Sequence, residues 1–371
     1  MPSTLRFLKQ HQWPSEDAVT ATEEGYSRGT EDLPATVFRP AGARAPLPGW
    51  VLLHGLAYTG REHPALVRFA SALAASGALV LVPEIPEWRA LRMAPAISTA
   101  TIRAAVIALA GRADVAPGRT GLIGFSFGAT QALIAAADPA LHGRLSGIAA
   151  WGGYYDVHQL FRFGITGRHS LDGENYETDP DPYGSWVAGF NYLTSIEGHE
   201  SDGDVATALK RLAEEAGRRQ LYAGSPDYDD FKREVRATLP PAKRELFDLF
   251  AAPTNVGKPT PADGERYERA MSLARRLADA ALRTEPLLDP GPFLPRIVTP
   301  TLVAHARDDR LVPFTDATRI CRALPDNVVE GCTVMGLFGH SGKPPVELGR
   351  IGLVRETLRF IGVLRGILGL A

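Results

Sequence analysis

The chain has 371 residues, of which 45% are hydrophobic and 22% are charged, the ordinary balance of a globular protein that can bury a large core. Its 40 basic and 42 acidic residues give a net charge of -2, so the charge gives no reason to expect a nucleic acid or another polyanion as partner. The N-terminus lacks a signal-peptide pattern, and no run reaches the roughly 18 apolar residues of a membrane span, which predicts a cytoplasmic protein without a membrane-spanning segment.

The predicted elements begin after a polar N-terminal arm, residues 1–34, which could form a short helix or an edge hairpin. Short apolar or alternating runs then predict strands, at residues 35–40, 50–55, 78–83, 120–125, 147–151, 300–305 and 332–335. Apolar residues at helical spacing predict helices between and after them, at residues 64–76, 97–109, 127–137, 315–324 and 345–368. The alternation predicts an α/β protein with a mostly parallel sheet and helices on both faces.

The alternation is interrupted between residues 156 and 295, where no buried parallel strand is recognisable. A polar loop at 172–183 comes first, followed by segments whose charges surround an apolar stripe, at residues 205–218, 229–239, 244–250 and 264–282. We therefore expect a mainly helical cap at 156–295, inserted into a core formed by residues 35–155 and 296–371.

A nucleophile elbow is predicted at Gly124-Phe125-Ser126-Phe127-Gly128, which matches the pattern Gly-x-Ser-x-Gly. A buried strand leads into this pentapeptide and a helix of small residues leaves it, as a nucleophile elbow requires. The tight turn needs glycines because side chains there would collide with the strand and the helix. Ser126 is the predicted nucleophile, at a helix N-terminus that favours developing negative charge.

A serine hydroxyl needs a neighbouring imidazole to take its proton, and the imidazole needs an acid to orient it and stabilise its charged form. In proteins with such an elbow the chain order is serine, acid, histidine. Asp308 and Asp309 both follow the predicted strand at 300–305, where they could also be solvated loop acids. Asp309 is the preferred acid, because Asp-x-x-Val-Pro is the usual spacing in proteins that this chain resembles, with Asp308 as the fallback. His340 is the last histidine, after the strand at 332–335, and is the predicted base. His305, inside a strand, is expected to be a packed core residue.

Two backbone N–H groups are expected to stabilise the oxyanion of an acyl-transfer reaction. One is that of Phe127, directly after the nucleophile, and the other is that of Leu56, in the loop after the strand at 50–55. His54 is expected to brace this loop. Tyr58 is a candidate for substrate binding, although an aromatic side chain in a loop is equally a lid contact.

An aromatic cluster after the strand at 147–151 is a second candidate for substrate contact. Tyr154 and Tyr155 are the predicted substrate-binding residues in this cluster, which also contains Trp151, Phe161 and Phe163. Aromatic residues at this spacing are more often part of a core or of cap packing than of a binding site. The cluster therefore supports an apolar pocket without defining one.

These features together resemble the α/β-hydrolase superfamily, and specifically its esterase, lipase and prolyl-oligopeptidase-like branches. The resemblance covers about residues 35–155 and 296–365, and it is carried by His54-Gly55, by the elbow around Ser126, by Asp309-Arg310-Leu311-Val312-Pro313 and by Gly339-His340. It implies a sheet of about eight strands, a Ser-His-Asp triad and an acyl-enzyme mechanism without a cofactor. The sequence His54-Gly55-Leu56 departs from the His-Gly-Gly-Gly run of one lipase branch and argues against that branch.

The function expected from the resemblance is hydrolysis of a carboxylic ester of a small to medium acyl substrate, with no metal and no nucleic-acid partner. A thioesterase or an amidase or peptidase of the same fold is the close alternative, and a non-catalytic binding module is the more distant one. The apolar final helix is expected to pack on the sheet with its first half; its second half leaves a homodimer open.

The two cysteines, Cys321 and Cys332, have two interpretations. They could pair in an oxidising compartment, but two isolated thiols are more often plain buried residues. No group of cysteines and histidines has the spacing of zinc ligands.

Overall fold

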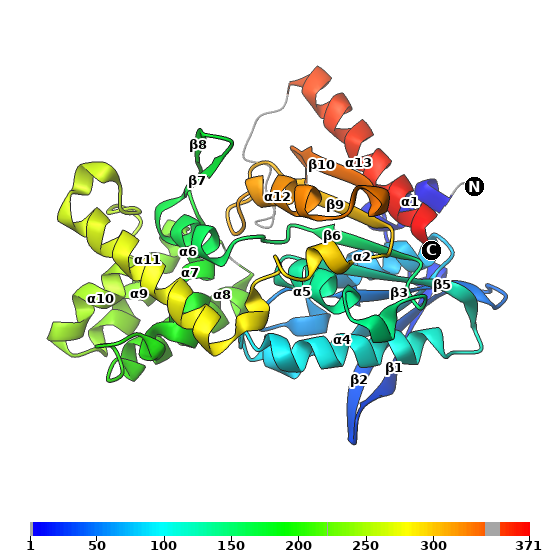
Figure 1. Cartoon of the computed structure of the whole chain (residues 1–371), viewed down its shortest axis with the longest axis horizontal. Coiled ribbons are helices and arrows are strands. Elements are labelled where there is room, and N and C mark those ends of the chain that lie inside the picture. Colours follow the sequence, from blue (N-terminus) through cyan, green and yellow to red (C-terminus); the bar gives the residue numbers. More distant parts are fainter. Residues whose placement is uncertain (1–2, 221, 338–348) are drawn as a thin grey trace.

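The computed structural model describes residues 3–220, 222–337 and 349–371. Its centre is an eight-stranded sheet with the strand order β1-β2-β4-β3-β5-β6-β9-β10 (Figure 1). The strands are β1 (Val19–Arg28), β2 (Glu31–Pro40), β3 (Leu47–Leu53), β4 (Leu79–Pro83), β5 (Val115–Phe125), β6 (Gly147–Trp151), β9 (Thr301–Ala306) and β10 (Val329–Met335). The pairs β1–β2 and β2–β4 are antiparallel and the other pairs are parallel, which confirms the expected mostly parallel eight-stranded sheet.

Both faces of the sheet are covered by helices, and this explains why the central strands are continuous apolar runs. Successive residues of β3 point to opposite faces: Trp50 and Leu52 belong to one hydrophobic cluster, and Val51 and Leu53 belong to the other. Residues of α1 (Ser3–Gln12), α2 (Pro64–Ala75) and α13 (Arg350–Leu370) complete the first cluster. Residues of α4 (Pro95–Ala110), α5 (Phe127–Ala136) and α12 (Thr315–Ala323) contribute to the second.

The region predicted as an N-terminal arm contains both of the structures that its sequence left open. Helix α1 packs against α2 and α13. Strand β1 then pairs with β2 along its whole length, from Val19 opposite Pro40 to Arg28 opposite Glu31. Residues 19–28 are therefore an edge strand of the sheet.

Between β6 and β9 the chain leaves the sheet and forms a largely helical region at one end of it (Figure 1, green to yellow). Its elements are α6 (Val157–Thr166), the hairpin of β7 (Arg168–Leu171) and β8 (Glu174–Glu177), α7 (Pro182–Tyr192), α8 (Gly203–Arg219), α9 (Asp229–Ala237), α10 (Arg244–Ala251) and α11 (Glu265–Thr284). The segment 172–183, expected to be a loop, includes strand β8, and α6 and α7 were not predicted. We refer to residues 156–295 as the insertion; its division from the core as a separate cap stays a prediction.

The final helix α13 packs on the sheet with its second half rather than its first. Val363, Leu364 and Ile367 are buried. Ile351 and Leu358, in the first half, are 88% and 63% exposed. The expectation that the first half packs on the sheet was wrong, and the second half had been left open, because apolar residues at helical spacing do not reveal where a helix leaves the sheet. Within the described ranges, no helix is long and apolar enough to cross a membrane.

The two cysteines form a disulfide between α12 and β10, so the expectation of two buried thiols was wrong. Helix α12 packs on β10 and brings the Cα atoms of Cys321 and Cys332 to 6.3 Å, within the range that a disulfide spans. Disulfides persist mainly in oxidising compartments. The cytoplasmic location therefore stays a prediction, and this bond does not favour it.

Candidate active site

The predicted nucleophile lies on a sharp turn between β5 and α5. Ser126 has φ 56° and ψ -128°, a left-handed φ that non-glycine residues rarely adopt because of steric strain. The backbone N–H of Ser126 donates to the carbonyl of Trp151 at 2.8 Å, which ties the turn to the end of β6. Ser126 is half-buried and directly precedes the first residue of α5.

At the two glycines of the pentapeptide there is no room for a side chain. A β-carbon at Gly124 would overlap the carbonyl of Gly128, and a β-carbon at Gly128 would overlap the carbonyl of His54. The strand, the helix and the loop after β3 therefore approach one another more closely than any side chain at these positions would permit. This close approach holds the backbone of Ser126 in its strained conformation.

The loop after β3 lies directly against Ser126. A β-carbon at Gly55 would be 3.1 Å from Cβ and 3.5 Å from Oγ of Ser126. His54 Nδ1 lies 2.6 Å from the carbonyl oxygen of Gly55 and therefore carries the proton that it donates. Because a trans peptide is planar, with its C=O and N–H pointing in opposite directions, this bond also sets the direction of the N–H of Leu56.

His54 is a bracing residue of this loop, in agreement with the sequence analysis. It is 2% exposed, and its ring packs edge-on against Trp88 with the centroids 5.3 Å apart. Burial lowers the pKa of His54 to about 4, so the imidazole is neutral near pH 7. Phe127 is buried between Trp88 and Tyr154, and its N–H, at the first position of α5, has no partner within the helix.

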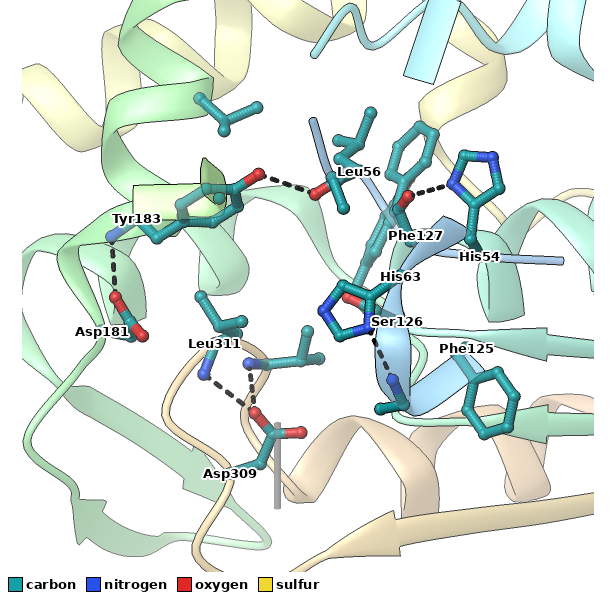
Figure 2. A pocket seen from close by; sticks show the side chains of 18 of the residues that line it. His54, Leu56, His63, Phe125, Ser126, Phe127, Asp181, Tyr183, Asp309 and Leu311 are labelled. Atoms are coloured by element: carbon teal, nitrogen blue, oxygen red, sulfur yellow. Dashed lines mark hydrogen bonds between the residues drawn. The ribbon is translucent and has the colours of Figure 1, made fainter. Parts of the chain in front are cut away.

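Asp309 lies at the carboxyl end of β9 and lines the same cavity as Ser126 (Figure 2). The residue is 2% exposed, and its Oδ1 accepts hydrogen bonds from the N–H groups of Leu311 at 2.8 Å and Val312 at 3.0 Å. These bonds fix the carboxylate in the turn. Asp308 is half-buried and does not line the cavity, so the geometry favours Asp309 of the two candidates.

His305 is a buried core residue, as its position in β9 predicts. Its Nε2 lies 3.1 Å from the carbonyl of Val312 and 3.2 Å from Oδ2 of Asp309. The predicted base, His340, lies outside the described residues.

A cavity of about 910 Å³ opens above Ser126, between the core and the insertion. On the side of the insertion it is lined by apolar residues of α6 and α7, among them Leu160, Phe161, Ile165, Val187 and Ala188. On the side of α1 and α2 it is lined by His11, His63, Arg68 and Phe69. The volume is that of a site for a small organic molecule.

Of the three predicted substrate-binding tyrosines, one lines the cavity and two do not. Tyr154 lines the cavity and donates its hydroxyl proton to the carbonyl of Leu288 at 3.0 Å. Tyr58 is outside the lining; its exposed ring packs under the guanidinium of Arg218 in α8, 5.6 Å from the ring centroid. Tyr155 is also outside it. Tyr58 is thus a contact between the loop and the insertion, the alternative that the sequence left open.

The sequence analysis missed the residue that connects the insertion to the loop beside Ser126. Tyr183, in the first turn of α7, donates its hydroxyl proton to the carbonyl of Leu56 at 2.8 Å (Figure 2). A helix start could have been recognised at Asp181-Pro182, because aspartate is a common N-cap and proline a common first helical residue. In the structure, Asp181 Oδ1 accepts the N–H of Tyr183 at 3.0 Å.

The strand order and the serine on a strained turn between the fifth strand and the following helix define the α/β-hydrolase fold, with the nucleophile elbow of that fold. No protein-family model matches the chain, and no curated protein matches it in sequence.

Several solved structures are similar in fold. Acylaminoacyl peptidase from Pyrococcus horikoshii is 12% identical, with a TM-score of 0.49, over 96% of this chain and 43% of that chain. Brefeldin A esterase, a bacterial homologue of human hormone-sensitive lipase, is 17% identical, with a TM-score of 0.47, over 99% and 83%. A 2,6-dihydroxy-pseudo-oxynicotine hydrolase is 16% identical, with a TM-score of 0.47, over 98% and 74%. Since all three TM-scores lie below 0.5, the fold assignment depends on the strand order and the elbow.

Proposed function

We propose that this protein is a serine hydrolase that cleaves a carboxylic ester of a small to medium acyl substrate. The observation that carries the proposal is the environment of Ser126. A strained turn presents its hydroxyl at the N-terminus of α5, beside the Gly55–Leu56 peptide and beneath a largely apolar cavity. A structural serine has no need of such a turn, whereas a nucleophile does.

The reaction follows the two steps of acyl transfer. His340, assigned by chain order, takes the proton of Ser126 as Oγ attacks the ester carbonyl, and Asp309 stabilises the imidazolium that forms. The N–H groups of Leu56 and Phe127 donate to the oxyanion of the tetrahedral intermediate. His340 then protonates the leaving alcohol, and the same groups activate water to hydrolyse the acyl-enzyme.

The cavity supports an apolar acyl group rather than a peptide. Its lining on the side of the insertion consists mainly of aliphatic and aromatic side chains from α6 and α7. Such a lining favours neutral apolar groups, because it offers few partners to a charged group that loses its water. A thioesterase and an amidase or peptidase remain the alternative activities. The homodimer remains a separate prediction about the oligomeric state.

Two measurements test the proposal. Substituting Ser126→Ala should lower ester turnover by at least about 10³-fold and abolish labelling by a fluorophosphonate probe, because both need the activated hydroxyl. The control Ser146→Ala removes a serine whose hydroxyl bonds to the carbonyl of Thr120, and it should retain both. Labelling of Ser126→Ala at the wild-type rate would sink the proposal.

A non-catalytic binding module would behave differently, because its serine would not react with the probe at all. A panel of p-nitrophenyl esters of increasing chain length, compared with matched anilides and thioesters, separates the enzymatic alternatives. We expect esters with short to medium chains to be the best substrates. Faster cleavage of anilides or thioesters than of every ester would replace the esterase assignment.

A further inference from the structure

The insertion contacts the loop that carries a proposed oxyanion donor. The hydroxyl of Tyr183, on α7, donates to the carbonyl of Leu56 at 2.8 Å, across 127 positions of sequence. Tyr183 is partly buried beside the cavity, and burial raises the pKa of its hydroxyl above the usual value. The hydroxyl is therefore protonated near neutral pH, where it can donate to the carbonyl of Leu56.

Leu56 is consequently held from both sides. The peptide before it is fixed by the bond from His54 Nδ1 to the carbonyl of Gly55, and the peptide after it is fixed by Tyr183. With both planes oriented, the two backbone torsions of Leu56 have little freedom, and the direction of its N–H is set. Stabilisation of an oxyanion depends on donors that point at the developing charge before it forms.

Tyr183 is itself anchored to the turn that carries Asp309. The N–H of Asp181 donates to the carbonyl of Arg310 at 2.8 Å, and the carboxylate of Asp181 caps the N–H of Tyr183. On the next residue of α7, a β-carbon at Gly184 would lie 3.6 Å from the side chain of Leu311. The first turn of α7 thus contacts both the turn at residues 309–312, which carries Asp309, and the loop after β3 (Figure 2).

We propose that Tyr183 is a positioning residue that holds the N–H of Leu56 in the orientation needed to bind the oxyanion. This inference rests on the proposed function, because it assumes that Leu56 is an oxyanion donor. Tyr183 lines the cavity, but its hydroxyl proton is donated to the carbonyl of Leu56, so the proposed role is exerted through the Leu56–Ala57 peptide. The insertion then has a part in the chemistry as well as in enclosing the cavity.

The test is Tyr183→Phe, which removes one hydroxyl and keeps the ring. Loss of a whole oxyanion donor costs about 10²–10³ in kcat, so loss of its alignment should lower kcat by about 10- to 50-fold. KM should stay within about threefold, because the ground-state carbonyl uses the donor less than the transition state does. The matched control is Tyr228→Phe, since the buried Tyr228 also donates to a backbone carbonyl, that of Leu212, but lies outside the cavity lining.

A second readout separates positioning from a general disturbance. An aryl trifluoromethyl ketone forms a tetrahedral oxyanion on the serine, whereas the matching methyl ketone reports ground-state binding. Tyr183→Phe should weaken inhibition by the trifluoromethyl ketone by the same factor as kcat and leave the methyl ketone unchanged. Incorporating 4-aminophenylalanine at position 183 restores a donor on the same ring and should recover most of the activity.

The outcomes distinguish this inference from the proposed function. If the wild type turns over esters and Ser126→Ala does not, but Tyr183→Phe keeps kcat and ketone affinity within about twofold, the positioning role is refuted alone. Equal losses for both ketones would mean that Tyr183 shapes the cavity, which also refutes it. If Tyr183→Phe fails to fold, the 4-aminophenylalanine variant decides, because a properly folded variant with a donor must be active. Wild-type protein without Ser126-dependent turnover refutes the proposed function itself.

Discussion

The stability of the fold should depend on the protonation of Asp316, a carboxyl on α12 with no exposed surface. Its Oδ1 accepts from Nε2 of Gln159 at 2.6 Å and from Arg319 at 3.2 Å, and its Oδ2 accepts from the N–H of Tyr155 at 3.0 Å. Burial nevertheless outweighs these donors and raises the pKa of Asp316 from 3.8 to about 6. The group connects α12 to the insertion, because Gln159 belongs to α6.

The sign of the effect follows from the direction of the shift. The folded state binds the proton of Asp316 more tightly than the unfolded state does. Protonation of this carboxyl therefore stabilises the folded state, and the full stabilisation is present below pH 3.8. The contribution is lost as the pH rises through about 6. A difference between 3.8 and about 6 corresponds to about 3 kcal/mol in total, of which about 1.5 kcal/mol falls between pH 5 and pH 8.

Urea unfolding of the wild type and Asp316→Asn at several pH values between 5 and 8 measures this contribution. The free energy of unfolding of the wild type, minus that of Asp316→Asn, should fall by about 1.5 kcal/mol as the pH rises across this range. The absolute difference also contains the altered hydrogen bonds of the amide, but those do not titrate. The change with pH is therefore the quantity to compare.

Asp114→Asn is the matched control. A hydrogen bond from Arg112 is the main cause that lowers the pKa of Asp114 to about 2, so this carboxyl is ionised in both states above pH 5. Its difference from the wild type should stay constant from pH 5 to pH 8. A constant difference for Asp316→Asn as well, or one that rises with pH, would refute the interpretation of Asp316 as a carboxyl penalised by burial.

Two further substitutions test the support around the site. Gly128→Ala should destabilise the protein by about 1–3 kcal/mol and lower ester turnover more than tenfold, because the new methyl group overlaps the carbonyl of His54; unchanged thermal melting and turnover would contradict the close approach described. Glu84→Gln should destabilise the loop after β3 by about 2 kcal/mol, because the buried carboxylate of Glu84 accepts from Arg61 at 3.0 Å and from Arg89 at 2.8 and 2.9 Å. Chemical denaturation measures this destabilisation. A decrease in the free energy of unfolding below about 0.5 kcal/mol would mean that solvent screens the ion pairs of Glu84 with Arg61 and Arg89.

The core of the fold could be predicted because its signals are local. Each central strand is a short apolar run, and the elbow at Ser126 combines a strand, two glycines and a helix within a few residues. Asp308 and Asp309 could be identified as candidate acids because both follow a recognisable strand. The structure distinguishes them by the turn in which Oδ1 of Asp309 accepts hydrogen bonds from two backbone N–H groups.

The remaining features depend on contacts that the sequence does not encode locally. Helix α7 was missed because it is buried on most sides, with Ser185, Trp186 and Val187 in succession, and so lacks an amphipathic stripe. Tyr58 was identified as a candidate from its loop, but the direction of its ring depends on Arg218 in α8. Pairing of the cysteines likewise depends on how α12 lies on β10.

The parts of the insertion should differ in how many substitutions they tolerate, and the first turn of α7 should tolerate the fewest. Substitutions near Asp181 act on two loops of the core at once, because this turn bonds to Arg310 and to Leu56. Helices α9 and α10 supply none of the residues that line the cavity. Substitutions on the surfaces of α9 and α10 should therefore have little effect on catalysis. Substitutions at the start of α7 should alter the loops beside Ser126 and Asp309.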